Sequence, residues 1–324
     1  MIFALLRRAC YAGVMVSCAL AGGAFAGEFP DRPIRLVVPY SPGGGTDVVA
    51  RGLAEGMSQK LGQPVVVENR PGANGIIGTR QVATAPADGY TYVLVVNSHL
   101  INPLIQKEMP YDTFKDFDGV TMVARSPLAF LVGSDMDIDS LDAFLAKARE
   151  PGARFSIGSS ENMTRLVGDM LNYYEKLGMV SVMYPGGAPL MTSVAGGQTT
   201  IGTTSILTAT PLKQAGKLRP LAITGTKRID VWPDVPTMHE LGKPQYDDVY
   251  TAFSLYAPAR TPRGILDKVQ QTVREVVYGE KMRNALAAQA AEPVANSVED
   301  FQAQVKRDFA FWKSLAEAVN LKPL

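Results

Sequence analysis

The residues best suited to chemistry form a glycine-rich turn near the N-terminus. An apolar run ends at Tyr40 and is followed by Ser41, Pro42, three glycines, Thr46 and Asp47. Apolar residues then recur with helical spacing over residues 48–61. A turn without bulky side chains before a helix N-terminus can hold an anion on backbone N–H groups and the helix dipole. The pattern predicts an anion site here, with Thr46 or Asp47 capping the helix; a turn that is glycine-rich for packing alone is the alternative.

The same stretch lacks the motifs of nucleotide-binding proteins. No Gly-Lys-Ser/Thr follows the glycines, and the third glycine of the dinucleotide fingerprint would fall on Val48. The chain also has no Gly-x-Ser-x-Gly, His-Glu-x-x-His or Ser-x-x-Lys. The two histidines, His99 and His239, are too few for a typical zinc site. We therefore expect no enzymatic activity, no metal and no cofactor.

Three further places combine a predicted strand end with small or polar residues. Residues 90–96 lead to Asn97 and Ser98, residues 155–158 lead to a hydroxyl-rich segment at 159–164, and residues 180–184 lead to Pro185-Gly-Gly-Ala188. Residues 201–205 form another strand, which ends in hydroxyls. Ligands of open α/β sheets bind beyond the carboxyl ends of strands, so these turns are candidate binding elements. His99 is expected to be a loop residue that makes hydrogen bonds only.

The elements that position these turns alternate along the chain, which predicts an α/β fold. Expected strands cover 36–40, 64–68, 90–96, 120–124, 128–132, 155–158, 180–184, 201–205 and 221–224. Expected helices cover 48–61, 76–85, 141–149, 165–176 and 189–195, with two more beginning after Thr261 and after Ser297. A chain of this length exceeds the usual single domain, so we expect two lobes. We place lobe 1 at 27–124 and 222–324, lobe 2 at 125–221, and a ligand cleft between them.

The N-terminus has the features of a cleavable export signal. Arg7 and Arg8 precede an apolar stretch, and Ala24-Phe-Ala26 fits a cleavage site, so residues 1–26 are predicted to be removed. Both cysteines, Cys10 and Cys18, lie inside this segment. A lipoprotein signal at Cys18 and twin-arginine export are weaker alternatives. A cysteine-free exported chain fits the periplasm, and the near balance of 32 basic and 31 acidic residues gives no support for nucleic-acid binding.

In combination, several motifs resemble one known family. They are Pro30-Asp-Arg-Pro-Ile-Arg-Leu-Val-Val-Pro39, Pro42-Gly-Gly-Gly-Thr-Asp47, Gly62-Gln-Pro-Val-Val-Val-Glu-Asn-Arg-Pro-Gly72, Asp88-Gly-Tyr90, Ile101-Asn-Pro103, Tyr184 with Gly186 to Pro189, Gly196-Gly-Gln198, Ala215-Gly-Lys-Leu-Arg219 and Pro233-Asp-Val-Pro-Thr237. The chain resembles the Bug-type substrate-binding proteins of tripartite tricarboxylate transporters, over nearly its whole length after the signal.

The resemblance implies a two-lobed type II periplasmic binding protein (Venus-flytrap) fold, each lobe a mixed sheet flanked by helices. It also implies closure on a small carboxylate, held by backbone amides and hydroxyls, and delivery to membrane permease subunits by a monomeric receptor. We place the site at these residues: Ser41, Gly43, Gly44, Gly45, Thr46, Asp47, Asn97, Ser98, Ser159, Ser160, Thr164, Arg165, Gly186, Gly187, Ala188, Thr204 and Ser205.

The chain departs from the family pattern at four of the places discussed. Ser159 and Glu161 stand at family glycine positions, and Arg165 stands where the family has histidine. Arg165 either pairs with a ligand carboxylate or lies on a solvated helix face, while Glu161 would repel an anion unless it points away or pairs with Arg165. Thr204 replaces an Asp of many relatives, which disfavours an amino-acid ligand.

Two other functions remain open from the sequence. The chain could act as a ligand-sensing accessory that presents its closed form to a signalling partner. It could also be a periplasmic hydrolase that uses Ser98 with His99, although neighbouring residues on a strand point to opposite faces and are poorly placed for proton transfer.

Overall fold

Ten strands are joined by hydrogen bonds through one long strand, β4 (Phe117–Gly133). The computed structural model describes residues 29–321. The predicted signal segment and its cleavage site therefore lie outside the described residues. Residues from Arg32 onward cluster as one compact unit, and all that follows concerns that unit. None of its described helices is long and apolar enough to cross a membrane.

Strands on the first half of β4 form a mixed sheet. In spatial order this sheet contains β2 (Val65–Asn69), β1 (Ile34–Val38), β3 (Thr91–Val95), β9 (Tyr250–Pro258) and β4, with β10 (Glu292–Pro293) also on β4. β1 pairs in parallel with β2 and β3, whereas β9 is antiparallel to β3 and β4. β2 was expected to be a buried strand, but it forms the sheet edge and leaves Val66 48% exposed.

Strands on the second half of β4 form another mixed group. They are β7 (Ile201–Ser205), β5 (Ser156–Ser159), β6 (Val180–Met183) and β8 (Leu218–Ile223). Pairing of β4 changes from β9 to β7 between Pro127 and Leu128. Two separate strands had been predicted around Arg125-Ser-Pro127, whereas the structure has one strand of 17 residues. The predicted lobe boundaries remain a prediction.

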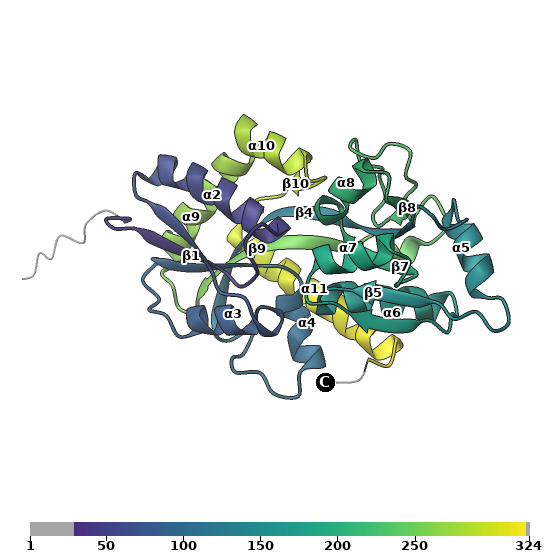
Figure 1. Ribbon diagram of the computed structural model, residues 1–324. Coiled ribbons are helices and arrows are strands. Elements are labelled where there is room, and N and C mark those ends of the chain that lie inside the picture. The colour runs from purple at the N-terminus through teal and green to yellow at the C-terminus, as the bar shows by residue number, and fades with distance from the viewer. Residues whose placement is uncertain (1–28, 322–324) are drawn as a thin grey trace, which may run out of the picture. The chain divides into compact units, whose positions relative to one another are not determined.

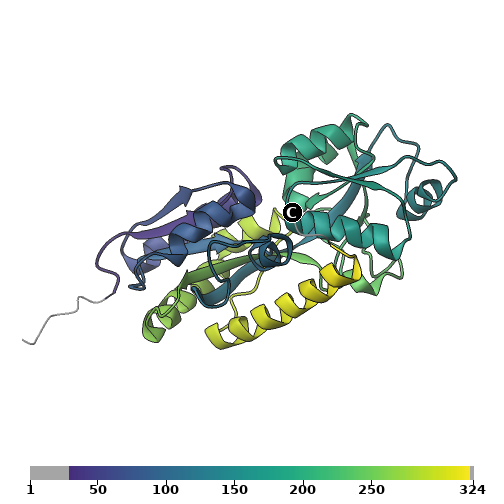
Figure 2. The ribbon, with the colours of Figure 1, turned by 90° about the horizontal axis from the view of Figure 1, so that it is seen from below.

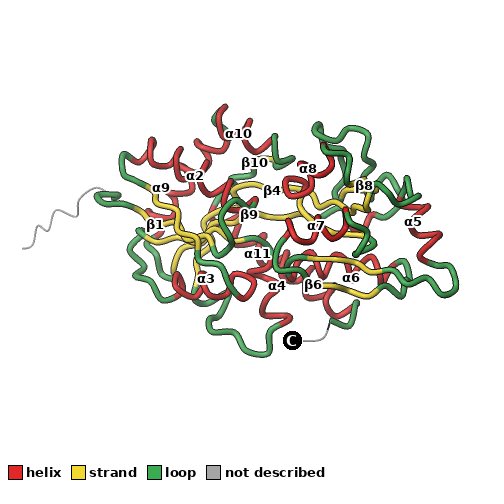
Figure 3. Tube along the Cα trace, in the orientation of Figure 1, coloured by secondary structure: helices red, strands yellow, loops and turns green. Residues whose placement is uncertain are grey.

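Helices cover both faces of these strands (Figures 1 and 3). Around the first sheet they are α2 (Gly45–Leu61), α3 (Ile76–Ala83), α4 (Ser98–Ile105), α9 (Arg263–Val277), α10 (Glu280–Ala287) and α11 (Val298–Ala318). Around the second group they are α5 (Leu141–Ala148), α6 (Asn162–Tyr174), α7 (Gly187–Ala195) and α8 (Ile206–Gln214). Two short 3-10 turns lie at Ala73–Gly75 and Pro244–Tyr246.

The long helix α11 packs near both strand groups that adjoin β4. It contacts β4, α4, α6 and α9, and Figure 2 shows it running from the first sheet toward the second. Ser297 caps it by accepting a hydrogen bond from the Asp300 amide at 3.1 Å, as the sequence predicted. Its predicted apolar stripe is buried at Phe301 and Trp312, each 1% exposed. One apolar cluster therefore includes α11 together with residues of both strand groups.

Candidate functional site

The glycine-rich turn connects β1 to α2 without placing a side chain over the helix end. α2 begins at Gly45, and its N-cap Gly44 makes no side-chain cap bond. Residues 41–44 are exposed, while Thr46 and Asp47 are buried. The first amides of a helix have no intrahelical partner. The turn therefore leaves N–H groups and the positive end of the dipole available to an anion.

Asp47 holds this turn in place and does not cap the helix as predicted. One oxygen of its carboxylate accepts hydrogen bonds from the Gly43 amide and from Arg51, both at 2.9 Å. The other accepts one from Asn69 at 2.8 Å. Burial alone would raise the pKa of Asp47, but these hydrogen bonds lower it below its usual value. Gly43 has φ +79°, which suits glycine. The Asp47 side chain therefore bonds back to the turn and leaves the helix end open.

Two predicted residues follow β3, where α4 begins. Asn97 is 4% exposed and its Oδ1 accepts the Ala252 amide at 2.7 Å, which ties β3 to β9. Ser98 is fully buried, and its hydroxyl donates to an oxygen of Glu161 at 3.0 Å. Ser98 therefore lies at a contact between the two strand groups. The helix α4 itself was not predicted.

His99 is a core residue, and the expectation of a hydrogen-bonded loop histidine is wrong. It lies in α4 at 2% exposure, and neither ring nitrogen has a hydrogen-bond partner within residues 29–321. The rings of Tyr111, Phe117 and Tyr256 surround it, with centroid distances of 5.9, 5.1 and 4.8 Å. Burial lowers the pKa of His99 to about 3. The His99 ring therefore packs with aromatic residues, while the neighbouring Ser98 hydroxyl donates a hydrogen bond to Glu161.

The segment before α6 presents a carboxylate to the first sheet. Glu161 precedes α6 directly, and Thr164 accepts the amides of Ser160 and Glu161, each at 3.2 Å. Burial raises the pKa of Glu161, and the hydrogen bond from Ser98 offsets part of that rise. Arg165 does not pair with Glu161: its Nε lies 3.5 Å from a carboxylate oxygen of Asp169. Glu161 thus has no cationic partner in the described part of the chain.

The remaining predicted residues lie around the N-termini of α7 and α8. α7 begins at Gly187 with Gly186 as N-cap and no side-chain cap bond, and Ala188 follows in its first turn. A Cβ atom added at Gly187 would lie 2.6 Å from Thr208 Cγ2 and 3.4 Å from Thr204 Oγ1. This turn therefore requires glycine and adjoins the end of β7. Ser205 caps α8 by accepting the Thr208 amide.

Three contacts join the two strand groups near the predicted residues, although none of them links two predicted residues directly. Besides the bond between Ser98 and Glu161, a Cβ at Gly45 would lie 3.5 Å from Leu207 Cδ2. Asn162 at the start of α6 donates to Asn102 of α4 at 3.0 Å. We call the region enclosed by the starts of α2, α4, α6, α7 and α8 the interlobe site.

Other residues predicted for the site contact only residues of their own strand group. Ser159 donates to the sulfur of Met183 at 3.1 Å. Ser41 is exposed, and its hydroxyl has no hydrogen-bond partner among the described residues. A ligand role for these residues, and for Arg165, remains a prediction.

Sequence reasoning missed several residues that shape the interlobe site. Tyr40 accepts the Val96 amide at 3.3 Å; burial raises its pKa well above the usual range, and the charge of Glu161 adds to the rise. Leu207 and Phe253 both lie within 4.0 Å of a Cβ placed at Gly45. An apolar residue on a strand or helix usually signals core packing, so nothing in the sequence distinguishes these two. Within residues 29–321, no group of three or more acidic, histidine or cysteine side chains could hold a metal ion.

Comparison with known proteins places this arrangement in a family. A sequence model of the tripartite tricarboxylate transporter family receptor matches residues 49–321. The protein BugT of Bordetella pertussis is 31% identical over 315 residues, which cover 96% of this chain and 96% of BugT. The assignment to a family therefore rests on similarity over nearly the whole chain and does not depend on a single motif.

Solved structures show the same fold. R. palustris Rpa4515 with adipate has a TM-score of 0.86 and 31% identity, covering 92% of this chain and 100% of that one. MatC from Rhodopseudomonas palustris with bound malate has a TM-score of 0.79 and 27% identity, covering 89% and 99%. The predicted α/β fold with two lobes is confirmed. The chain belongs to the tripartite tricarboxylate transporter receptor family, the Bug-type solute-binding receptors of the periplasm.

Proposed function

We propose that this chain captures a small organic carboxylate in the interlobe site by lobe closure. The ligand is a mono- or dicarboxylate, aliphatic or aromatic, and the chain delivers it to the membrane permease subunits of a tripartite tricarboxylate transporter. It acts as a monomer after export, with residues 1–26 removed, and catalyses no reaction.

The observation that carries this proposal is the uncapped start of α2. Asp47 is buried and turned back onto Gly43 and Arg51, so it does not occupy the helix end. An anionic ligand would complete the hydrogen bonding of those first amides. The start of α7 also lacks a side-chain cap, which supplies a second position for a carboxylate.

The ligand would contact residues from five turns. From the first sheet these are Ser41, Gly43, Gly44, Gly45, Thr46, Asp47, Asn97 and Ser98, and from the second group Ser159, Ser160, Thr164, Arg165, Gly186, Gly187, Ala188, Thr204 and Ser205. Closure would exclude water and strengthen each hydrogen bond to the ligand.

The ligands bound by two relatives support the ligand class. Adipate and malate each carry two carboxylates, and the proteins that hold them match 92% and 89% of this chain. Adipate is the longer and more apolar of the two, so one fold accepts different spacers between its carboxylates. The spacer preferred by this chain would depend on side chains such as Glu161, which bonds to Ser98, and Leu207, which lies beside Gly45.

A thermal-shift screen of residues 27–324, unfolded and refolded to remove any carried ligand, tests the proposal. A ligand at 100 times its Kd adds about 2.7 kcal/mol to the free energy of unfolding, which raises the midpoint by several degrees. We expect a rise with one or more mono- or dicarboxylates and none with the matching amides, which carry no charge. Equal rises with acids and amides would contradict carboxylate recognition.

A single variant tests the position of the ligand. Gly44 has extended backbone geometry, and a Cβ added there would meet Ser41 O at an ordinary 3.5 Å. Gly44→Asp should therefore cap α2 with its own carboxylate and exclude the ligand anion without unfolding the chain. The control is Gly264→Asp, which adds the same side chain in the first turn of α9, where a Cβ meets nothing within 4 Å. Loss of binding in both variants, or in neither, would place the ligand elsewhere.

A further inference from the structure

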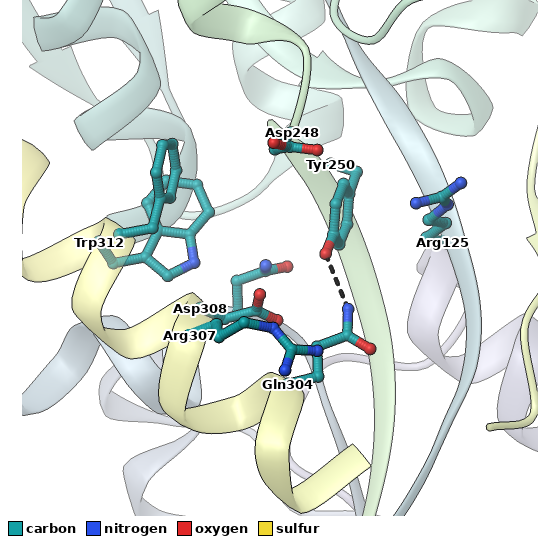
Figure 4. Close-up of a pocket in the computed structure, with 9 residues that line it drawn as sticks. Arg125, Asp248, Tyr250, Gln304, Arg307, Asp308 and Trp312 are labelled. Atoms are coloured by element: carbon teal, nitrogen blue, oxygen red, sulfur yellow. Dashed lines mark hydrogen bonds between the residues drawn. The ribbon is translucent and has the colours of Figure 1, made fainter. Parts of the chain in front are cut away.

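A cavity lies between α11 and the strands β4 and β9, which connect the two strand groups. It has a volume of about 300 Å³, which is the size of a small-molecule site. Its walls come from the start of α4, from β4, from the end of the loop before β9, from β9 and from one face of α11 (Figure 4). The lining residues are Asn97, Arg125, Asp248, Tyr250, Gln304, Arg307, Asp308, Phe311 and Trp312. Of the residues predicted for the interlobe site, it shares only Asn97.

Hydrogen bonds between different elements fix the walls of this cavity. Gln304 of α11 donates to the Tyr250 hydroxyl at 3.0 Å and accepts from Asn296 at 2.9 Å. Asn97 is held by its Oδ1, which accepts the Ala252 amide. The guanidinium of Arg125 bonds to Glu292 and lies 5.4 Å from the centre of the Tyr250 ring. The cavity is therefore a built feature, with groups held in defined positions.

Two hydrogen-bond donors line the cavity. The Trp312 side chain is 1% exposed and forms part of the cavity wall. Figure 4 shows the indole nitrogen on the side of the ring that faces Asp308 and Tyr250. A buried indole N–H usually finds an acceptor. Asn97 is 4% exposed and uses only its oxygen in the described chain, so its amide nitrogen is a second available donor.

Acceptors without partners lie beside these donors. Asp308 is one helical turn before Trp312 on α11, so both side chains share a face. Neither Asp308 nor Asp248 makes an ion pair or hydrogen bond within the described residues, and Arg307 beside them is also without an ion pair. Burial raises the pKa of Asp308 to about 6; the charge of Arg307 opposes this and that of Asp248 adds to it. The two carboxylates therefore have no ion-pair or hydrogen-bond partner among the described residues, although the charge of Arg307 acts on Asp308.

We propose that this cavity binds a small zwitterion of the amino-acid class, at a site separate from the interlobe site. The ligand's ammonium group would lie at Asp308 and Asp248, and its carboxylate would accept from Trp312 and Asn97 with Arg307 nearby. Tyr250 and Phe311 offer aromatic walls to an apolar or cationic side chain. A dicarboxylate would meet two acidic side chains, and a simple amine would leave the buried indole N–H without an acceptor.

Titration calorimetry on residues 27–324 tests this with each of the twenty common L-amino acids as probe. For any amino acid that binds, its decarboxylated amine and its deaminated acid are titrated as well. We expect saturable binding of at least one amino acid at millimolar concentration or below, and weaker binding of both analogues. Absence of binding by every amino acid would overturn the proposal.

Two variants locate the binding. Asp308→Asn removes the ammonium partner, and Trp312→Phe removes the N–H while keeping a ring in the core. Each should weaken binding about tenfold or more, because a charge-assisted hydrogen bond is worth roughly that ratio. Glu317→Gln on the exposed side of the same helix is the control and should bind as the unmodified chain does.

The result also separates this cavity from the interlobe site. Gly44→Asp should leave amino-acid binding intact, and Asp308→Asn should leave the carboxylate-induced thermal shift intact. Amino-acid binding that is lost in Gly44→Asp but kept in Asp308→Asn would overturn the second site. Failure of the carboxylate screen alone would leave the second site supported, because Asp308 and Trp312, whose variants test it, are not among the residues of the interlobe site.

Discussion

The Ser98 hydroxyl donates a hydrogen bond to a Glu161 carboxylate oxygen 3.0 Å away and so connects the two strand groups. Ser98 is fully buried and begins α4, whereas Glu161 directly precedes α6. The carboxylate therefore faces the interlobe site with a hydroxyl as its partner and no cation beside it. Its charge must influence any anion that binds between the lobes.

We expect carboxylate binding to strengthen as pH falls toward the raised pKa of Glu161. Protonation removes the negative charge that repels the ligand, and burial makes this protonation easier than for an ordinary Glu. Glu161→Gln should bind the same carboxylate on the order of tenfold more tightly at neutral pH, since a like charge several ångströms away costs on the order of 1–3 kcal/mol. Titration calorimetry at several pH values measures both effects.

The control for this prediction is Glu317→Gln, an exposed change on α11 far along the chain from the interlobe site. It should keep the affinity and the pH dependence of the unmodified chain. Tighter binding at higher pH, or a Glu161→Gln variant with an unchanged pH profile, would contradict the role assigned to Glu161.

Much of the fold follows from local sequence patterns. Local sequence patterns located α5 and α11, which are capped by Ser140 and Ser297; both side chains accept backbone amides. Three helices were missed, α4, α8 and α10; of these, α4 and α8 are short and contain an internal proline. Proline usually ends a helix, so pattern reasoning disfavours such segments. For the same reason Pro127 suggested a break, although β4 continues through it.

The turns proposed to bind the ligand were predictable as turns because glycine and hydroxyl residues mark strand ends locally. The contacts across the interlobe site were not, since Ser98 and Glu161 are 63 residues apart and no periodic pattern joins them. The cap assigned to Asp47 was wrong for a related reason. Its choice of the Gly43 amide depends on Asn69 and Arg51, which come close only in the folded chain.

Asp47→Asn should destabilise the chain by about 2–3 kcal/mol, because an amide cannot accept from all three donors that surround Asp47. Since the folded-state pKa of Asp47 is lowered, its contribution is present above the ordinary pKa and is lost as pH falls through the folded value. Denaturant unfolding at neutral and acidic pH should show the difference between the variant and the unmodified chain shrinking in acid. Asp267→Asn, at an exposed ion pair with Arg263, should change stability little.

Gly187→Ala should weaken ligand binding by displacing the start of α7. The added Cβ would lie 2.6 Å from Thr208 Cγ2, so either α7 or α8 must shift. Thr208→Ser removes that methyl group and keeps the hydroxyl, so the double variant Gly187→Ala/Thr208→Ser should recover affinity. The matched control is Gly264→Ala in the first turn of α9, where a Cβ meets nothing within 4 Å. A double variant as weak as the single one would argue against this steric cause.

His99→Phe should remove an acid-dependent loss of stability while keeping ligand binding. The folded-state pKa of His99 is about 3 and the ordinary value is 6.5, so the unfolded chain binds the proton more readily between these values. Stability due to a neutral His99 is therefore full above about pH 6.5 and declines as pH falls toward 3.

Phenylalanine fits the ring cluster of Tyr111, Phe117 and Tyr256 and cannot take up a proton. Between pH 7 and pH 4, the free energy of unfolding should therefore decline less steeply in the variant than in the unmodified chain. His239→Gln, at the exposed second histidine, should not flatten the curve in this way. An equal slope in His99→Phe and the unmodified chain would mean that folding does not lower the pKa of His99.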